Sequence, residues 1–278
     1  IVEEYEQFFT DEKILTVGIE NFNKKRLVKY DLENKVWALL EKRDLKGNLR
    51  LIEKLNPLVK KVYVINDNSL NAQHTQPLID ELFKTFDKSY ELIYLKEDSL
   101  KELKSKLENK ALNSVALFIR FYKNSLGELY ENKQIAEVIK ESKLPIFVTD
   151  SIFLDEKAVG GKIVDLNDFG EKAGFLAVDL LNNKEVKKVN IYKDLEIVLD
   201  EKKINQFYLD IRNLKQKYKL INKELTFFDK NRAFIDSVFL FSPLLVIFII
   251  LFFINIYLRK KIQYKLKQRI ELDSLLLN

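Results

Sequence analysis

An uncharged apolar run near the C-terminus constrains this chain more than any other feature. Residues 238–258 read VFLFSPLLVIFIILFFINIYL, and the polar interruptions are Ser242, Asn255 and Tyr257. A helix of about 20 apolar residues, rising about 1.5 Å each, spans a hydrocarbon core of about 30 Å. A buried helix of a soluble core rarely runs this far without a charge. We therefore expect residues 238–258 to form a transmembrane helix.

The charges that flank this run orient it. Its N-terminal flank carries two cations offset by two acids between residues 229 and 236. Six cations follow its C-terminal end within eleven residues: Arg259, Lys260, Lys261, Lys265, Lys267 and Arg269. The positive-inside bias places such a cluster in the cytoplasm. We predict an inner-membrane protein with residues 1–236 extracytoplasmic and residues 259–278 as a cytoplasmic juxtamembrane helix.

Composition argues against nucleic-acid binding and against catalysis by this chain. The net charge is +5, but residues 259–278 carry +4 of it, so the rest of the chain is almost neutral. A nucleic-acid binder carries its basic charge on the folded domain. The absence of Cys and the single His74 leave little for nucleophilic catalysis or a zinc site. We predict no enzymatic activity for the chain as given, no cofactor and no metal.

The region before the apolar run alternates short apolar segments with amphipathic ones. We predict strands over residues 13–18, 61–66, 91–95, 114–121, 144–149, 189–192 and 195–199. We predict helices over residues 45–55, 77–86, 99–107, 133–142, 168–181 and 202–207. Strands separated by helices of this length indicate βαβ units and a parallel sheet covered on both faces. The predicted fold class is α/β.

Ligands of open parallel sheets bind at the carboxyl ends of the strands. The residues that follow the predicted strands are therefore the ligand-binding candidates, joined by a Gly pair that permits close backbone approach. They are Asn66, Asp67, Asn68, Ser69, Arg120, Tyr122, Asp150, Ser151, Gly160 and Gly161. For Asp67 and Asp150 a helix-capping role is equally open. Arg120 could form a surface ion pair, and the Gly pair could form a turn.

Several of these segments together resemble a known family. The stretch NPLVKKVYVIND at residues 56–67, LPIFVTD at 144–150, the Gly pair at 160–161 and the helix opening DFGEKAG at 168–174 carry the resemblance. In the last of these, Gly170 and Ala173 stand at the G-x-x-A element of the family. Residues 13–208 resemble the ABC-transporter substrate-binding-protein-like family, which has a type I periplasmic-binding-protein fold. That fold consists of two α/β lobes hinged around a cleft.

The resemblance implies an order of domains. Residues 1–60 would be a remnant of the first lobe and its crossover, 61–187 the second lobe, and 188–237 a return segment leading to the membrane. The family has further βα units before the strand at residues 13–18. Because the chain also begins at Ile1 and contains no Met, we expect a processed chain or a fragment with an incomplete first lobe.

The resemblance also implies a role. A periplasmic-binding-like domain followed by a single membrane helix is similar to the sensor domains of histidine kinases and diguanylate cyclases. The expected ligand is a small solute, and the family binds amino acids and purine-like molecules. The expected partners are the membrane and a second copy of the chain, through the stripe Leu258, Ile262, Leu266 and Ile270. Two alternatives are a docking surface for a separate solute-loaded protein and a membrane-anchored subunit of an ABC transporter.

Overall fold

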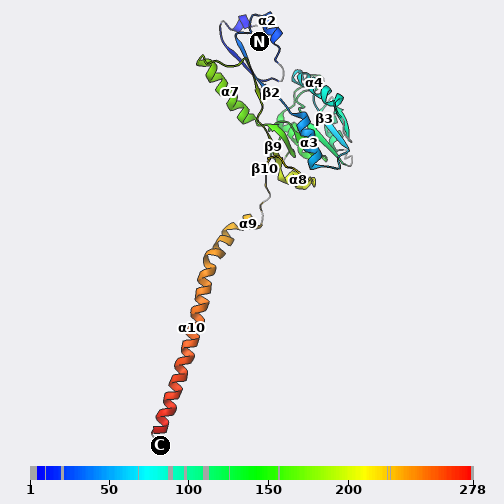
Figure 1. Cartoon of the computed structure of the whole chain (residues 1–278). Helices are drawn as coiled ribbons and strands as arrows, with labels where there is room; N and C mark the ends of the chain where they lie inside the picture. The colour runs from blue at the N-terminus through cyan, green and yellow to red at the C-terminus, as the bar shows by residue number, and fades with distance from the viewer. Residues whose placement is uncertain are drawn as a thin grey trace. The chain divides into compact units, whose positions relative to one another are not determined.

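The computed structural model describes residues 5–9, 11–19, 22–67, 69–86, 90–96, 99–108, 113–124, 126–155, 157–223, 225 and 227–276. The chain forms two compact units, residues 1–223 and 224–278. The first unit holds two sheets, and the second holds a short helix followed by a long one (Figure 1).

The larger sheet has seven strands. In spatial order they are β10 (Lys219–Ile221), β9 (Leu195–Asp200), β7 (Gly160–Val164), β6 (Ile146–Val148), β5 (Ser114–Phe118), β3 (Lys61–Ile65) and β4 (Glu91–Leu95). On one face the core includes residues of α3 (Leu45–Leu55), α4 (Leu70–Lys84) and α8 (Glu201–Gln206). On the other face it includes residues of α5 (Leu100–Glu108) and α6 (Asn132–Glu141). All five residues of β5 are buried, as expected of a central strand covered on both sides.

The smaller sheet has three parallel strands, β1 (Ile14–Ile19), β2 (Val36–Glu41) and β8 (Val189–Tyr192), with β2 in the centre. The short helices α1 (Tyr5–Phe8) and α2 (Lys24–Lys29) contribute Tyr5 and Leu27 to a core with Val36. Helix α7 (Leu166–Leu181) buries Phe169 in a cluster with Leu39 and Tyr192 of the small sheet. The helix that the sequence analysis placed in the second lobe therefore packs on the small sheet.

The α/β fold with parallel sheets is confirmed, with differences in detail. Strands β2, β7 and β10 were not predicted, and β5 ends at Phe118 rather than at residue 121. Strand β9 runs antiparallel to β7. Leu195, the first residue of β9, pairs with Val164, the last residue of β7, so β9 starts at the end of the sheet where β7 stops and runs back along it. Helix α4 begins at Leu70, so the helical segment predicted over residues 77–86 continues a helix that starts earlier and includes Pro77.

Helix α3 links the two sheets, because it follows β2 directly. Asp44 caps its N-terminus by accepting a hydrogen bond from the amide of Gly47 at 2.7 Å. Lys162 of β7 donates to the same carboxylate at 2.6 Å. Burial raises the pKa of Asp44, but these hydrogen bonds outweigh burial and the pKa lies below its usual value. The start of α3 is thus fixed to the larger sheet by a charged contact.

The second unit consists of α9 (Phe227–Lys230) and α10 (Arg232–Leu276). Helix α10 has 45 residues and contains the apolar run without interruption, with Pro243 in its N-terminal part. Its apolar side chains, among them Leu245, Phe248 and Phe252, are exposed. By length and composition, this helix is able to cross a membrane.

Candidate functional site: a cleft between two sheets

A cleft of about 360 Å³ lies where the carboxyl ends of the two sheets meet. The small sheet contributes Gly18 from the end of β1, Glu41 from the end of β2 and Arg43 just beyond it. The larger sheet contributes the segments that follow β3, β5 and β6. The residues from these segments are Ser69, Arg120, Tyr122, Lys123, Asp150 and Ile152. Leu129, Asn132 and Leu166 complete the lining.

A buried charge cluster joins the two sides of this cleft. The guanidinium of Arg43 contacts Glu41 at 2.8 Å and Asp150 at 2.9 Å, and it also donates to the hydroxyl of Thr149. The side chains of Arg43, Glu41 and Asp150 are at most 9% exposed. Buried ion pairs are costly to break, because removal of one partner leaves the others buried and charged. Arg43 therefore holds together the ends of β2 and β6, which belong to different sheets.

Asp67 shapes the floor of the cleft rather than facing it as a free carboxylate. One of its oxygens accepts hydrogen bonds from the amides of Tyr122 at 2.6 Å and Lys123 at 3.2 Å. The other accepts from the amide of Ser69 at 2.9 Å. The side chain of Ser69 in turn caps α4 through the amide of Ala72. Asp67 thus ties the loop after β3 to the loop after β5 and positions the cleft residues on both.

Tyr122 and Arg120 give the cleft an aromatic surface and a cation. Tyr122 stacks on Phe153, with ring centroids 6.2 Å apart. Burial and the carboxylate of Asp150 raise the pKa of Tyr122, and the cations Arg43 and Arg120 oppose this shift only in part. The phenol is therefore neutral and able to donate or accept a hydrogen bond. Arg120 is itself buried.

Four of the ten predicted ligand-binding residues line the cleft, and the others lie behind it, elsewhere or outside the described residues. Ser69, Arg120, Tyr122 and Asp150 line the cleft, and Asp67 lies directly behind it. Asn68 lies outside the described residues. The remaining four are placed elsewhere: Asn66, Ser151, Gly160 and Gly161.

Each of these four residues has a structural contact. The amide of Asn66 donates to the hydroxyl of Tyr94 at 3.2 Å, and Ser151 accepts from the amide of Leu166 at 3.2 Å. The Gly pair lies inside strand β7 and not in a turn. A Cβ at Gly160 would lie 2.0 Å from a carbonyl oxygen of β9, and one at Gly161 would lie 2.1 Å from a carbonyl oxygen of β6. The pair is therefore required by close strand packing.

Sequence reasoning missed the contribution of the small sheet to the cleft. Glu41 is the last residue of β2 and Arg43 lies just beyond it, and the apolar run VWALL of this strand was readable from the sequence. Recognition of that strand would have placed both residues at its carboxyl end. Lys123, Leu129 and Asn132 belong to an irregular loop and the start of α6, for which the sequence gives no comparable signal. Among the described residues, no group of three or more His, Cys, Asp or Glu could hold a metal ion.

Comparisons with known proteins agree with this fold. The chain matches no protein-family model, and the search of curated proteins finds no match. A ligand-free, open substrate-binding protein with adhesive properties from Clostridium difficile has a TM-score of 0.52 and 15% identity, over 80% of this chain and 75% of that chain. An ABC domain in complex with L-Trp from Streptococcus pneumonia has a TM-score of 0.56 and 16% identity, over 79% and 77%.

A conserved domain protein from Vibrio cholerae is similar to the same degree, with a TM-score of 0.56 and 16% identity over 76% of this chain and 73% of that chain. At such identities the likeness concerns the fold alone. The first unit of this chain thus has the α/β fold of substrate-binding proteins of the periplasmic-binding-protein type.

Proposed function

We propose that the first unit is an extracytoplasmic domain that binds a small solute in the cleft between the two sheets. The observation that carries this proposal is the cluster of Arg43, Glu41 and Asp150, which brings the carboxyl ends of strands from both sheets to one cleft. Carboxyl ends of parallel strands are where ligands of such folds bind. The fold shared with substrate-binding proteins supports the proposal.

The chemistry of the cleft favours a polar solute of modest size. Arg120 and Lys123 supply cations, Ser69 and Tyr122 supply hydroxyls, and Ile152 supplies apolar surface. A volume of about 360 Å³ lies toward the small end of ligand sites, which run from about 300 to 1,000 Å³. A solute with a carboxylate or carbonyl group and a planar or apolar part suits this lining. Amino acids and purine-like molecules belong to that class, and the Streptococcus protein is described with L-Trp.

A screen for stabilisation tests solute binding. The full chain in lipid nanodiscs is heated with a panel of amino acids and purines, and unfolding of the first unit is followed. We expect at least one solute to raise the unfolding temperature, because a ligand that binds only the folded state stabilises it. The Arg120→Gln variant should lose this response, and Glu91→Gln, which changes an exposed residue away from the cleft, should keep it. A panel without any stabilising solute contradicts the proposal.

We further propose that α10 crosses the inner membrane and transmits the solute-bound state to a cytoplasmic output. Residues 1–236 would then be extracytoplasmic, and the chain would act as a homodimer in a sensor of the two-component kinase type, with a diguanylate cyclase as the alternative output. The support is the apolar run in α10 and the cations that follow it. The energy for this transmission would come from the solute, which must bind more tightly when the two sheets have closed around the cleft than when the cleft is open.

The natural absence of Cys makes the topology directly testable. Single substitutions Ser99→Cys and Ser274→Cys place one thiol on each side of the apolar run. We expect a membrane-impermeant maleimide to label the first in intact spheroplasts and the second only after permeabilisation. Equal labelling of both residues in intact spheroplasts would contradict the crossing.

The second candidate is a membrane-anchored substrate-binding component of an ABC transporter. It is favoured by the similarity in fold to substrate-binding proteins. The two candidates differ in partner, since the transporter reading requires a permease that contacts the first unit. Crosslinking in membranes separates them: a permease crosslinked to the first unit supports transport, and a crosslinked second copy of the chain supports sensing.

A further inference from the structure

A pocket of about 820 Å³ lies at the β10 edge of the larger sheet, apart from the cleft. Residues of β7, β9 and β10 line it, together with residues 216–218, which lead into β10, and Lys223, which follows it. The pocket and the cleft share no lining residue. Ligand sites run from about 300 to 1,000 Å³, so this pocket has room for a whole solute molecule.

The pocket carries positive charge that the described part of the chain does not compensate. Lys217, Lys219 and Lys223 line it, and none of these three ammonium groups has an ion pair or a hydrogen bond among the residues that the structure describes. Lys162 also lines the pocket, but it is paired with Asp44 at 2.6 Å. Three unpaired cations therefore face one space.

This arrangement differs from an ordinary solvated surface. Exposed charges of both signs are usually interspersed on a soluble domain, but residues 215–223 contain four lysines and no acid. Three of these lysines line one concave pocket, whose apolar surface includes Ile197 and Leu220. Like charges gathered around one space repel one another, and an anion bound between them replaces that repulsion with attraction.

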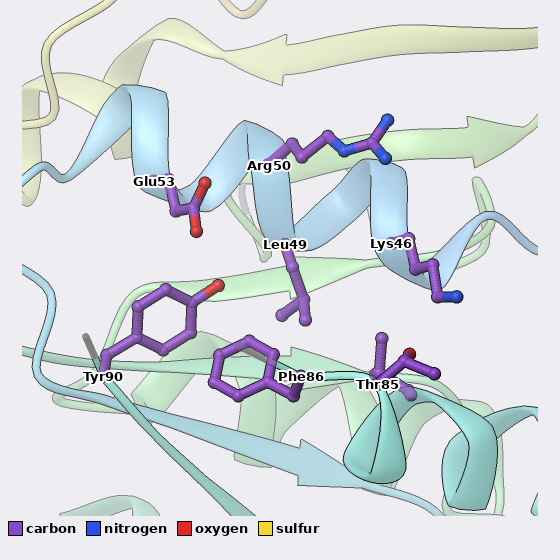
Figure 2. Close-up of a pocket in the computed structure, with 8 residues that line it drawn as sticks. Lys46, Leu49, Arg50, Glu53, Thr85, Phe86 and Tyr90 are labelled. Carbon is purple, nitrogen blue, oxygen red and sulfur yellow. The ribbon is translucent and has the colours of Figure 1, made fainter. Parts of the chain in front are cut away.

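A cavity of about 340 Å³ beside α3 lacks such an excess of charge (Figure 2). Its Lys46 is paired with Glu81 at 3.1 Å, and its remaining charged residues are one cation, Arg50, and one acid, Glu53. Figure 2 shows the hydroxyl of Tyr90 directed toward α3, on the side of Glu53. Burial, the charge of Glu53 and a hydrogen bond to Glu53 raise the pKa of Tyr90. The unbalanced charge thus distinguishes the pocket at β10 from this cavity.

The other groups of the pocket at β10 select the kind of anion. Glu196 lines it, so three unpaired cations and one acid give the lining a net charge of +2. A phosphate monoester carries a charge of about −1.5 to −2 at pH 7, which matches that excess. The carboxylate of Glu196 would repel a bare anion, but it accepts hydrogen bonds from hydroxyl groups. A ligand that joins a phosphate to several hydroxyl groups satisfies both requirements, and Gln216 and Tyr218 add further hydrogen-bonding groups.

We infer that this pocket binds a phosphorylated polyol, with its phosphate among Lys217, Lys219 and Lys223 and its hydroxyl groups on Glu196. The ammonium groups donate charge-assisted hydrogen bonds to the phosphate oxygens. The polyol phosphate is either a free solute or the headgroup of a phospholipid, because both present the same groups. The site is separate from the cleft and does not depend on the function proposed for the cleft.

The test uses probes that differ in the phosphate group. Binding of glycerol 3-phosphate and of glycerol to the full chain in phosphatidylcholine nanodiscs is measured by titration calorimetry, with empty nanodiscs as the control. We expect saturable binding of glycerol 3-phosphate alone. Because each exposed ion pair accounts for about a threefold change in affinity, the double variant Lys217→Gln, Lys219→Gln should weaken this binding about tenfold. Lys101→Gln, which changes an exposed lysine outside the pocket, should leave it unchanged.

Glu196→Gln tests the part of the pocket that recognises hydroxyl groups. The variant loses an acceptor of hydrogen bonds from the polyol and also loses a charge that repels phosphate. We therefore expect its affinity for glycerol 3-phosphate relative to inorganic phosphate to fall by a factor of about three or more. An unchanged ratio would overturn the assignment of the hydroxyl groups to Glu196.

The composition of the nanodiscs separates the two sources of the ligand. The same titration is repeated with phosphatidylglycerol in place of part of the phosphatidylcholine. Weaker binding of glycerol 3-phosphate in these discs supports a headgroup that occupies the pocket, and unchanged binding supports a free solute. Absence of saturable binding in phosphatidylcholine discs, equal binding of glycerol, or a double variant that binds within twofold of the parent chain would each overturn the inference. Arg120→Gln in the cleft should leave glycerol 3-phosphate binding unchanged, and a loss in that variant would place the binding in the cleft instead.

Discussion

Replacement of Arg43 by Met tests the buried charge cluster on which the cleft depends. The substitution keeps an unbranched side chain and removes the cation that contacts both Glu41 and Asp150. Because all three side chains are at most 9% exposed, neither carboxylate can be solvated freely in the variant. Breaking a buried ion pair by removal of one partner costs about 3–5 kcal/mol. With an m-value of about 2 kcal/mol per molar urea, the unfolding midpoint should fall by roughly 1.5–2.5 M.

The chain carries a built-in probe for this measurement. Its single Trp, Trp37, lies on β2 four residues before Glu41, is buried, and donates to the carbonyl of Val186 at 3.2 Å. Its fluorescence in urea therefore reports on the small sheet. The full chain in nanodiscs is unfolded with and without Arg43→Met. Arg212→Met serves as the control, because that Arg pairs with Asp210 on the surface and should leave the midpoint unchanged.

A charge-free variant separates electrostatics from packing. Arg43→Met combined with Glu41→Gln and Asp150→Asn contains no buried charge at this position and should recover about half of the lost stability or more. An unfolding midpoint for Arg43→Met within about 0.3 M of the parent chain would refute the reasoning, since at an m-value of about 2 kcal/mol per molar this shift corresponds to only about 0.6 kcal/mol. A triple variant that is less stable than Arg43→Met would assign the loss to packing instead.

Three further substitutions test the framework around the cleft. Gly160→Ala should prevent folding or lower the free energy of unfolding by more than about 3 kcal/mol, because its Cβ would lie 2.0 Å from a backbone carbonyl oxygen. Gly174→Ala is the control in the same urea assay, and it should fold normally because its Cβ meets nothing within 4 Å. Asp67→Asn should cost about 1–3 kcal/mol and speed hydrogen exchange at the two amides it holds in the cleft loop. Asp44 has a pKa lowered by Lys162, so its contribution is present above about pH 3.9, the unfolded value, and is lost as the pH falls through the folded value. The urea midpoint of Asp44→Asn should therefore change less between pH 6 and pH 3 than that of the parent chain.

The sequence predicts the parts of the fold that local patterns encode. The β-branched segment KVYVI and the turn residues after it identify β3 and place Asp67 and Ser69 at its carboxyl end. Helix α3 begins and ends at the predicted residues, because its apolar residues recur at helical spacing and Asp44 caps it. The apolar run likewise indicates the long helix α10.

What the sequence leaves open depends on contacts between distant segments. The role of the Gly pair depends on how closely β6 and β9 approach β7, and no local pattern contains that distance. The packing of α7 on the small sheet depends on where the chain crosses between the sheets. Arg43 and Asp150 lie 107 residues apart, and only the fold brings them together.

The central claim is that a solute binds in the cleft and draws its two sides together. The distance between the small-sheet side and the larger-sheet side of the cleft tests this claim most directly. The double variant Asn34→Cys, Lys101→Cys carries two exposed spin labels in a chain without any other Cys. Asn34 lies just before β2 of the small sheet, and Lys101 lies on α5 beside the larger sheet. Their distance distribution is recorded by electron paramagnetic resonance on the full chain in nanodiscs, with and without a solute that stabilises it. We expect the solute to shorten the mean distance and Arg120→Gln to abolish the change. A solute that binds and stabilises the chain while the distance distribution stays the same would contradict closure of the cleft around it.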